Sequence, residues 1–335
     1  MAAPVRPPPG PSSRSPLRFR QRLKRFVSAL LIVYLGIVGM LVWLQRSLMY
    51  QARKGPVLVS EAEDRAPHIR ECHVTAADGV KLHGWLSLCD AESEIGRSQS
   101  LSQLGQGDRY LVVMFAGNAG NRLSRISQLD LYNGLGCDAL LFDYRGYAEN
   151  AGSPSEADLL RDARSIWDFA TNTLKVPPER IVISGESLGG GVATALASQV
   201  CREGHAPAAL VLRATFSSMV ETASAMYWWL PVRWVLLDTY QSIERMPHVT
   251  CPVLTYHGTA DEIIPFEQGL RLFESAPPTA KNGIEKRFLK IPDAGHNDIY
   301  QVGRQEIAEA IGQLLAAVQS ISLQRATDSD LRLAE

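Results

Sequence analysis

The chain has 335 residues, and its 46% hydrophobic and 21% charged residues allow a sizeable buried core and exclude disorder over the whole length. Lysine and arginine total 34 against 35 aspartates and glutamates, so the net charge of −1 provides no overall basic field for nucleic-acid binding. The five cysteines show no C-x-x-C spacing, which argues against a zinc ribbon, and they are too few for a disulfide scaffold in a chain of this length.

The N-terminal region combines a basic segment with an apolar one. Residues 1–25 are rich in proline, arginine and lysine and contain no acid, which predicts a disordered basic tail. Residues 26–44 carry no charge and lie between Arg25 and Arg46. A helix of this length roughly crosses a ~30 Å hydrocarbon core, and Trp43 suits its interface. Residues 26–44 are therefore predicted to form a transmembrane signal-anchor helix.

Two other interpretations of this segment compete with the anchor. A buried helix of a soluble protein normally keeps a polar face, which residues 26–44 lack. A cleaved signal peptide has a shorter apolar region and a small-residue cleavage site, and residues 45–50 offer none. Because the basic excess precedes the helix, we expect the N-terminus in the cytoplasm and the large C-terminal part on the opposite side of the membrane. Residues 45–69 are interpreted as a stem.

From residue 70 to about residue 320, short apolar runs alternate with helix-length stretches. Residues 72–76 and 80–88 flank Asp78-Gly79, a strong hairpin signal, and residues 91–108 are interpreted as a loop. Further apolar runs separated by amphipathic stretches predict a mostly parallel sheet covered by helices on both faces. The predicted strands are 111–115, 139–142, 181–184, 209–212, 253–256 and 288–291; the predicted helices include 156–173, 188–200 and a terminal helix at 305–318, followed by a flexible tail over residues 321–335.

The loops after the strands carry the chemistry in such sheets. Residues 185–189 form a G-x-S-x-G directly between an apolar strand and a helix rich in alanine and glycine. A sharp strand-to-helix turn of this kind lifts Ser187 above the sheet and points the helix N-terminus at a developing oxyanion. Ser187 is therefore the predicted nucleophile.

A serine nucleophile needs a base and an acid. In this architecture the chain order is serine, acid, histidine, which selects Asp261 and His296 at the ends of two late strands. His257 precedes the acid and is interpreted as a histidine that supports the loop. Asp293 and Asp298, on the loop of His296, stay open as alternative acids.

The oxyanion hole requires two donors. One is expected from the backbone N–H of Leu188, the residue after the nucleophile. The other is expected from the glycine-containing loop after the strand at 111–115, with Asn118 N–H as the first choice and Ala119 as the next. The loop lacks the G-x-G-x-x-G pattern and the lysine of a phosphate-binding loop, so a nucleotide site is not predicted.

The connection between the strands at 209–212 and 253–256 is longer than usual and holds three of the six tryptophans. Two interpretations remain open for residues 216–248: a helix packed on the core, or a small cap that forms an apolar wall for an acyl group or touches the membrane. The predicted substrate-binding residues are Trp228 and Trp229 in this segment and Tyr144 and Tyr147 at a strand end; packing within the fold is the alternative for the tyrosines and for Arg145.

These residues carry a family resemblance. Ser187, Asp261 and His296, together with the DYRGY string at 143–147, resemble the α/β-hydrolase superfamily. More narrowly, the chain resembles the single-pass, membrane-anchored α/β-hydrolase-domain serine hydrolases, whose usual strings are HGNAGN, DYRGYG, GxSLGG, HGxxD and GxHND. It departs from them at three positions: Ala116 replaces a histidine, Ala148 replaces the last glycine of DYRGYG, and Arg213 replaces a small or acidic residue.

The resemblance implies an α/β-hydrolase fold over residues 70–320 with a small cap insertion at about 216–248. We expect a membrane-anchored serine hydrolase that cleaves a carboxylic ester or thioester, lipid-like substrates included, through an acyl-enzyme intermediate. No metal or organic cofactor and no nucleic-acid partner is expected. A serine peptidase of the same fold and a catalytically silent scaffold remain alternatives, the latter because of Ala116.

Overall fold

The computed structural model describes residues 16–90, 103–106 and 109–334. The chain divides into two compact units, Met1–Gln45 and Arg46–Glu335. Most of the loop expected at 91–108 and residues 1–15 of the expected basic tail lie outside the described residues.

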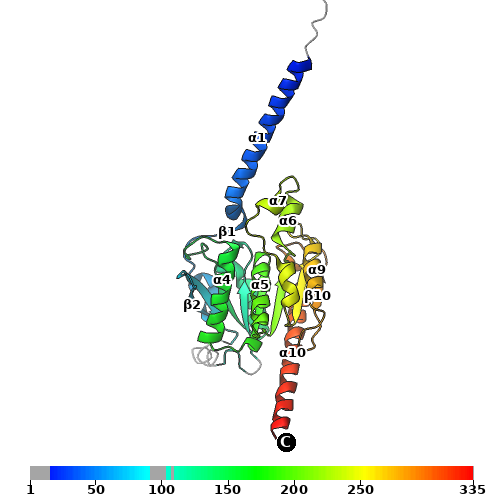
Figure 1. The fold of residues 1–335 in the computed structure, drawn as a ribbon. Helices are drawn as coiled ribbons and strands as arrows, with labels where there is room; N and C mark the ends of the chain where they lie inside the picture. Colours follow the sequence, from blue (N-terminus) through cyan, green and yellow to red (C-terminus); the bar gives the residue numbers. More distant parts are fainter. Residues whose placement is uncertain (1–15, 91–102, 107–108, 335) are drawn as a thin grey trace, which may run out of the picture. The chain divides into compact units, whose positions relative to one another are not determined.

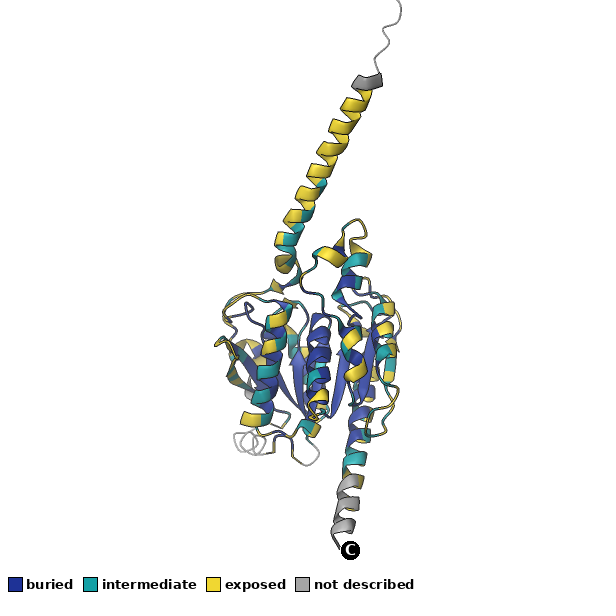
Figure 2. Ribbon diagram, viewed as in Figure 1, coloured by how far each residue is buried: buried dark blue, intermediate teal, exposed yellow. Residues whose placement is uncertain are grey.

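Helix α1, Pro16–Met49, contains the predicted membrane span (Figure 1). On length and composition, Phe19–Met49 is long and apolar enough to cross a membrane, and its most apolar stretch is unburied. Figure 2 shows the helix exposed along most of its length. The helix begins earlier than expected, so residues 16–25 are helical and not a disordered tail. Pro16 suits a first helical turn, and no glycine or proline follows it until Gly36.

The second unit is built on an eight-stranded sheet with the order β10-β9-β8-β7-β4-β6-β3-β2. The hairpin predicted around Asp78-Gly79 is present, because β2 and β3 pair antiparallel, and β3 also pairs antiparallel with β6; the remaining neighbours are parallel. The strands are β2 Ile69–Thr75, β3 Lys81–Ser87, β4 Leu111–Phe115, β6 Asp138–Phe142, β7 Ile181–Glu186, β8 Ala209–Arg213, β9 Val253–Gly258 and β10 Arg287–Ile291.

Helices cover both faces of this sheet, as the apolar strands predict. On β4, Leu111 and Val113 belong to one core cluster and Val112 and Met114 to another, because successive side chains point to opposite faces. The first cluster includes apolar residues of α4 (Glu156–Asp168), α5 (Leu188–Arg202) and α9 (Phe266–Ser275); the second includes those of α3 (Ile126–Gly134) and α10 (Ile299–Ala334). Figure 2 shows the strands and α5 deeply buried.

One predicted helix changes its type along its length, and another extends beyond its predicted bounds. The stretch 156–173 is helical throughout, but it changes from α4 to a π-helical turn, η3, at Phe169–Thr173. Helix α10 begins at Ile299, before the predicted residue 305, and continues to Ala334. It has a kink at Gly303, whose backbone angles are not helical. It extends past the end expected near residue 320 because the sequence contains no glycine or proline after Gly312.

The long connection between β8 and β9 is helical in four short pieces. They are α6 Met219–Met226, α7 Val232–Val235, α8 Ser242–Arg245 and the 3-10 turn η5 Met246–His248. Ser218 begins α6 by accepting a hydrogen bond from the Glu221 N–H, as an N-cap serine does.

The stem has a structure that its sequence does not predict. The two-residue strand β1, Gln51–Ala52, pairs in parallel with β5, Ala119–Gly120, in the loop after β4. A 3-10 stretch, η1 Val59–His68, with non-helical angles at Glu63, leads from there to the sheet. The stem is therefore joined to the body by hydrogen bonds that reach the predicted oxyanion loop.

Candidate active site

Ser187 lies directly after β7 and immediately before α5, at the turn that its motif predicts. Its backbone has φ 53° and ψ −118°, a strained conformation for a residue with a side chain. The flanking glycines make the turn sterically possible. A Cβ at Gly185 would lie 2.5 Å from the Gly189 carbonyl oxygen, and one at Gly189 would lie 2.1 Å from that of Phe115.

Neighbouring strands and loops hold this strained turn in place. The Ser187 N–H donates to the Arg213 carbonyl at the end of β8 at 2.9 Å. The Ser187 carbonyl accepts from the Gly190 N–H at 2.9 Å and from Thr215 Oγ1 at 2.8 Å. These bonds fix the backbone of Ser187, whose residue is 8% exposed, at the edge of the sheet where the parallel strands end.

Asp261 and His296, predicted from chain order, lie in contact. His296 Nδ1 is 2.7 Å from Asp261 Oδ2, while the other carboxylate oxygen accepts the N–H groups of Ile263 and Ile264 at 2.9 and 2.8 Å. Burial by itself raises the pKa of Asp261, but the hydrogen bonds from His257, His296 and the Ile264 N–H lower it well below its ordinary value. The carboxylate thus stays ionised and can orient the His296 ring.

His257 occupies the other side of the same carboxylate. Its Nε2 lies 2.9 Å from the Ile264 carbonyl and 3.2 Å from Asp261 Oδ2. The side chain is fully buried, whereas that of His296 is 10% exposed. His257 therefore positions Asp261 and has no open path to a substrate, as its place before the acid in the sequence suggests.

The alternative acids have other partners. The Asp298 carboxylate accepts the Gly295 N–H at 2.7 Å and thus shapes the loop that carries His296. Asp293 adopts a positive φ of 59°, and its N–H donates to Thr259 Oγ1 at 2.9 Å. Among the hydrogen bonds of the described residues, none joins Ser187 Oγ to the His296 ring. In unliganded enzymes such bonds are often long and tighten only when substrate binds.

The predicted oxyanion loop lies beside the N-terminus of α5. Leu188 is the first residue of that helix, so its N–H lacks an acceptor within the helix. Within the described part of the chain, no acceptor takes the N–H of Asn118. The pairing of β5 with the stem uses the carbonyl groups of Asn118 and Gly120 and does not occupy the N–H of Ala119. Asn118 and Ala119 therefore both remain candidates for the second donor.

Tyr144 and Tyr147, predicted to bind substrate, bond to this loop through their hydroxyl groups. Tyr144 donates to the Ala116 carbonyl and Tyr147 to the Asn118 carbonyl, each at 2.7 Å, and both residues are buried. Their rings also contact each other edge to face. The neighbouring Arg145 is bound to carboxylates, Asp162 among them. These contacts fit the alternative interpretation, packing within the fold.

The stem supplies a second set of contacts to the loop. The Gln51 N–H donates to the Asn118 carbonyl at 3.0 Å, and the Arg53 N–H donates to that of Gly120 at 3.2 Å. The Asn118 side-chain amide donates to the Met49 carbonyl at 3.0 Å. The loop is therefore held from both sides although Ala116 stands where the resemblance leads us to expect a histidine. No pattern in the sequence signals these contacts.

Arg213, one of the three departures, joins the nucleophile turn to the histidine loop. Its guanidinium lies 3.0 Å from the Glu186 carboxylate, donates to the His296 carbonyl at 3.3 Å, and lies 4.3 Å from the centre of the Tyr300 ring. Burial raises the pKa of Glu186, but the charges of Arg213 and Arg125 lower it below its ordinary value. Glu186 and Arg213 have opposite charges, stand at the ends of two consecutive strands and are in register. This charge pattern is the signal in the sequence from which the ion pair could have been predicted.

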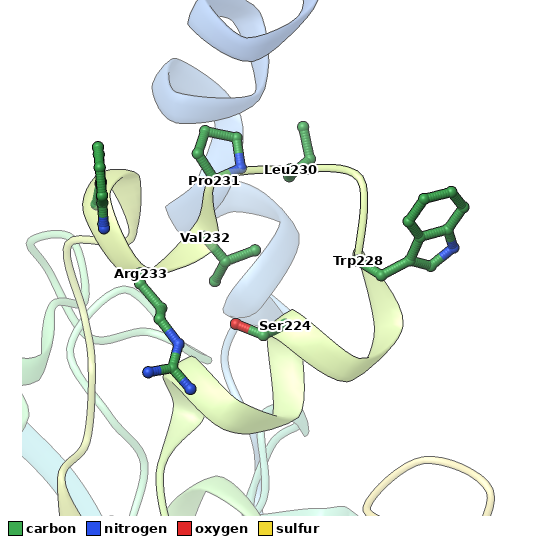
Figure 3. A pocket seen from close by; sticks show the side chains of 7 residues that line it. Ser224, Trp228, Leu230, Pro231, Val232 and Arg233 are labelled. Carbon is green, nitrogen blue, oxygen red and sulfur yellow. The ribbon is translucent and has the colours of Figure 1, made fainter.

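The connection between β8 and β9, which we call the cap, holds Trp228 and Trp229, the other predicted substrate-binding residues. Trp228 is 83% exposed and Trp229 is 43% exposed. Trp228 borders a hollow of about 360 Å³ formed within the cap itself; Figure 3 shows the indole directed away from the ribbon of the cap. The lining residues are Ser224, Trp228, Leu230, Pro231, Val232, Arg233 and Trp234. Among the described residues, no group of three or more His, Cys, Asp or Glu could hold a metal ion.

Comparisons with known proteins agree with this geometry. A profile of the prolyl oligopeptidase family matches residues 150–317. An uncharacterized protein of Mycobacterium tuberculosis is 37% identical over 297 residues, which cover 88% of this chain and 96% of that protein. The lysophosphatidylserine lipase ABHD12 of Rattus norvegicus is 33% identical over 268 residues, covering 74% of this chain and 67% of the lipase.

Solved structures share the fold at low sequence identity. An esterase of Pyrococcus furiosus has a TM-score of 0.58 at 17% identity and covers 80% of this chain and 98% of its own. An alpha-beta hydrolase of Vibrio vulnificus has a TM-score of 0.57 at 16% identity and covers 78% of this chain and 96% of its own.

Proposed function

The chain belongs to the prolyl oligopeptidase family of the α/β-hydrolase superfamily, and from this premise we propose that it is a membrane-anchored serine hydrolase that cleaves a carboxylic ester or thioester. The single observation that carries the proposal is the 2.7 Å contact of His296 with Asp261 on the same sheet edge as the strained turn of Ser187. A strained serine and a carboxylate-oriented histidine are the components of an activated nucleophile.

The proposed reaction has two halves. Ser187 Oγ attacks the carbonyl carbon while His296 Nε2 takes its proton, and the Leu188 and Asn118 N–H groups stabilise the resulting oxyanion. The tetrahedral intermediate collapses to an acyl-enzyme, and His296 gives the proton to the departing alcohol or thiol. Water then attacks the acyl carbonyl with His296 as base, and the carboxylic acid leaves as Ser187 regains its proton.

The relatives narrow the class of substrate that we propose. Proteins named lysophosphatidylserine lipase match at 29–33% identity, and the esterase fold neighbours share the sheet. We therefore propose an ester with one long acyl chain and a polar group. Such a substrate resides in or near membranes, which agrees with a candidate membrane span in this protein. For the anchor, the basic residues that precede residues 26–44 support a cytoplasmic N-terminus and a hydrolase domain on the opposite side.

A fluorophosphonate probe tests the nucleophile, because labelling requires an activated serine. We expect the full-length chain to be labelled and to hydrolyse p-nitrophenyl esters, and Ser187→Ala to lose both properties while its melting temperature stays near that of the wild type. Ser320→Ala, which removes an exposed hydroxyl bonded only to its own helix, is the matched control. Equal labelling of wild type and Ser187→Ala would refute the assignment, and an unlabelled, folded wild type would favour a silent scaffold.

A serine peptidase is the second candidate, because the matching family profile is that of prolyl oligopeptidases. The two candidates separate on substrate. We expect hydrolysis of acyl esters of graded chain length and no turnover of proline-containing peptide amides under the same conditions. Faster turnover of the peptide amide would reverse the assignment.

A further inference from the structure

The cap carries an exposed aromatic surface that the proposed chemistry does not use. We call Met226, Tyr227, Trp228 and Trp234 the cap patch. Trp228 and Trp234 are 83% and 89% exposed, and Met226 and Tyr227 are 52% and 43% exposed. Large apolar side chains gathered on a surface mark an interaction site, because leaving them in water forgoes the gain from burying their area.

The charges around the cap patch indicate what covers it. From Met226 to Leu237 the sequence contains one charged residue, Arg233, and no acid. Arg233 is exposed and borders the hollow shown in Figure 3. Tryptophan and tyrosine with a nearby cation are the residues enriched at the boundary between lipid and water, where a ring buries its apolar body and its polar atom stays hydrated.

Contacts of the stem join the base of the cap to Arg46, which follows the uncharged run 26–44. Arg46 binds Asp238 with two hydrogen bonds, Nε to Oδ2 at 3.0 Å and Nη2 to Oδ1 at 3.1 Å. The buried Tyr50 donates its hydroxyl to the same carboxylate at 3.0 Å. Asp238 follows the last residue of the apolar cap segment, and Trp234 lies only four residues before it, a reach of at most about 14 Å.

Arg46 is also the first charge after the uncharged run 26–44. If that run spans a bilayer, its end and therefore Arg46 lie at the bilayer surface, since a charge is costly inside the hydrocarbon. The side chain that marks the membrane boundary is thus bound to the residue that closes the cap segment. This contact ties the cap to the boundary without requiring any other contact with the helix.

We propose that the cap patch inserts into the interfacial layer of the same bilayer that residues 26–44 span, as a second contact with the membrane. The inference rests on the proposed membrane anchor. Because the cap follows β8, whose last residue Arg213 binds Glu186 beside Ser187, this contact holds the catalytic edge of the sheet near the lipid surface. An acyl ester in the bilayer then reaches the nucleophile with a shorter passage through water.

Tryptophan fluorescence in brominated lipid tests the proposal on the full chain. The chain is reconstituted into phosphatidylcholine and phosphatidylglycerol vesicles whose acyl chains carry bromine either near the headgroup or near the terminal methyl. Trp85 and Trp167 are 0% and 2% exposed and are shielded from lipid, and Trp43 and Trp229 are present in the wild type and the variant alike. We expect the double variant W228S/W234S to lose the part of the quenching that is strongest with bromine near the headgroup, because interfacial insertion is shallow.

Activity provides the second measurement. The single variant W234S, which leaves the predicted substrate-binding residues intact, should hydrolyse a vesicle-embedded acyl ester more slowly than the wild type while its rate on a soluble short-chain ester stays unchanged. Leu323→Ser, which removes a 58% exposed apolar side chain from α10, is the control and should match the wild type in both assays. Equal quenching of wild type and double variant would overturn the proposal, and so would patch-dependent dimers in the vesicles without such quenching, because a second copy would then cover the patch.

The design separates this inference from the proposals beneath it. Extraction of the wild-type protein from the vesicles by sodium carbonate would refute the proposed membrane anchor. A wild type that fails to hydrolyse the soluble ester refutes the hydrolase. A chain that resists extraction and hydrolyses the ester, yet shows no quenching difference, refutes only the role of the cap patch.

Discussion

Replacing Arg213 by methionine removes the side chain that joins the nucleophile turn to the histidine loop. The substitution keeps an apolar stem of similar length but deletes the guanidinium. Glu186 then loses its 3.0 Å ion pair, and the His296 carbonyl loses a donor at 3.3 Å. The side chains of Arg213 and Glu186 are only 7% and 14% exposed, so water cannot replace the lost partner fully.

The size of the effect follows from what remains around Glu186. Removing one partner of a buried ion pair costs about 3–5 kcal/mol. Glu186 keeps Arg125 Nε at 3.4 Å and a hydrogen bond from Gln128, so we expect the lower end, about 3 kcal/mol. At about 2–4 °C per kcal/mol for a domain of this size, the melting temperature should fall by roughly 6–12 °C. A small displacement of His296 should lower kcat by about tenfold, within the ~100-fold that a 1 Å misplacement costs.

The double variant E186Q/R213M separates the two effects. Glutamine removes the unpaired carboxylate, so the double variant should regain most of the lost melting temperature. Its kcat should stay low, because the contact to the His296 carbonyl is still missing. Thermal unfolding and ester hydrolysis, measured on the same preparations, provide both numbers. An R213M variant that melts and turns over like the wild type would show that Arg125 and Gln128 suffice and that Arg213 positions nothing.

Three further outcomes are expected. A chain lacking residues 1–46 should keep its kcat for a soluble ester, whereas the kcat of a chain lacking residues 1–54 should fall by up to about tenfold, because the stem no longer holds Asn118. This fall is smaller than the 100- to 1,000-fold loss that follows removal of an oxyanion donor. Equal kcat values for the two truncated chains would contradict this prediction. Because the pKa of Asp261 is lowered on folding, its contribution to stability is present above the ordinary aspartate pKa of 3.8 and disappears as the pH falls below it; urea midpoints at pH 5 and pH 3 should differ less in Asp261→Asn than in the wild type. Ala148 has a φ of 48°, so Ala148→Gly should raise the melting temperature slightly or leave it unchanged, and a clear fall would argue against backbone strain there.

The sequence alone was sufficient for the sheet and for the places of the three predicted catalytic residues. Short apolar runs predict buried parallel strands because a strand covered on both faces has no polar side. The chain order of serine, acid and histidine places Ser187 after β7, Asp261 after β9 and His296 after β10, where the structure has them. These features are local or depend on order along the chain, so a pattern in the sequence can carry them.

Tertiary structure decided the support of the site. Asn118 and Met49 are 69 positions apart, and Arg213 and His296 are 83 apart, so their contacts follow from which strand ends meet and not from any local pattern. Hydropathy likewise cannot tell an aromatic residue that packs inside from one that faces outward. The same prediction of substrate contact was made for Tyr144 and Trp228, but Tyr144 is buried with its hydroxyl bonded to the predicted oxyanion loop, whereas Trp228 is exposed on the cap. Such differences depend on how separate elements pack, because burial is a property of the assembled fold.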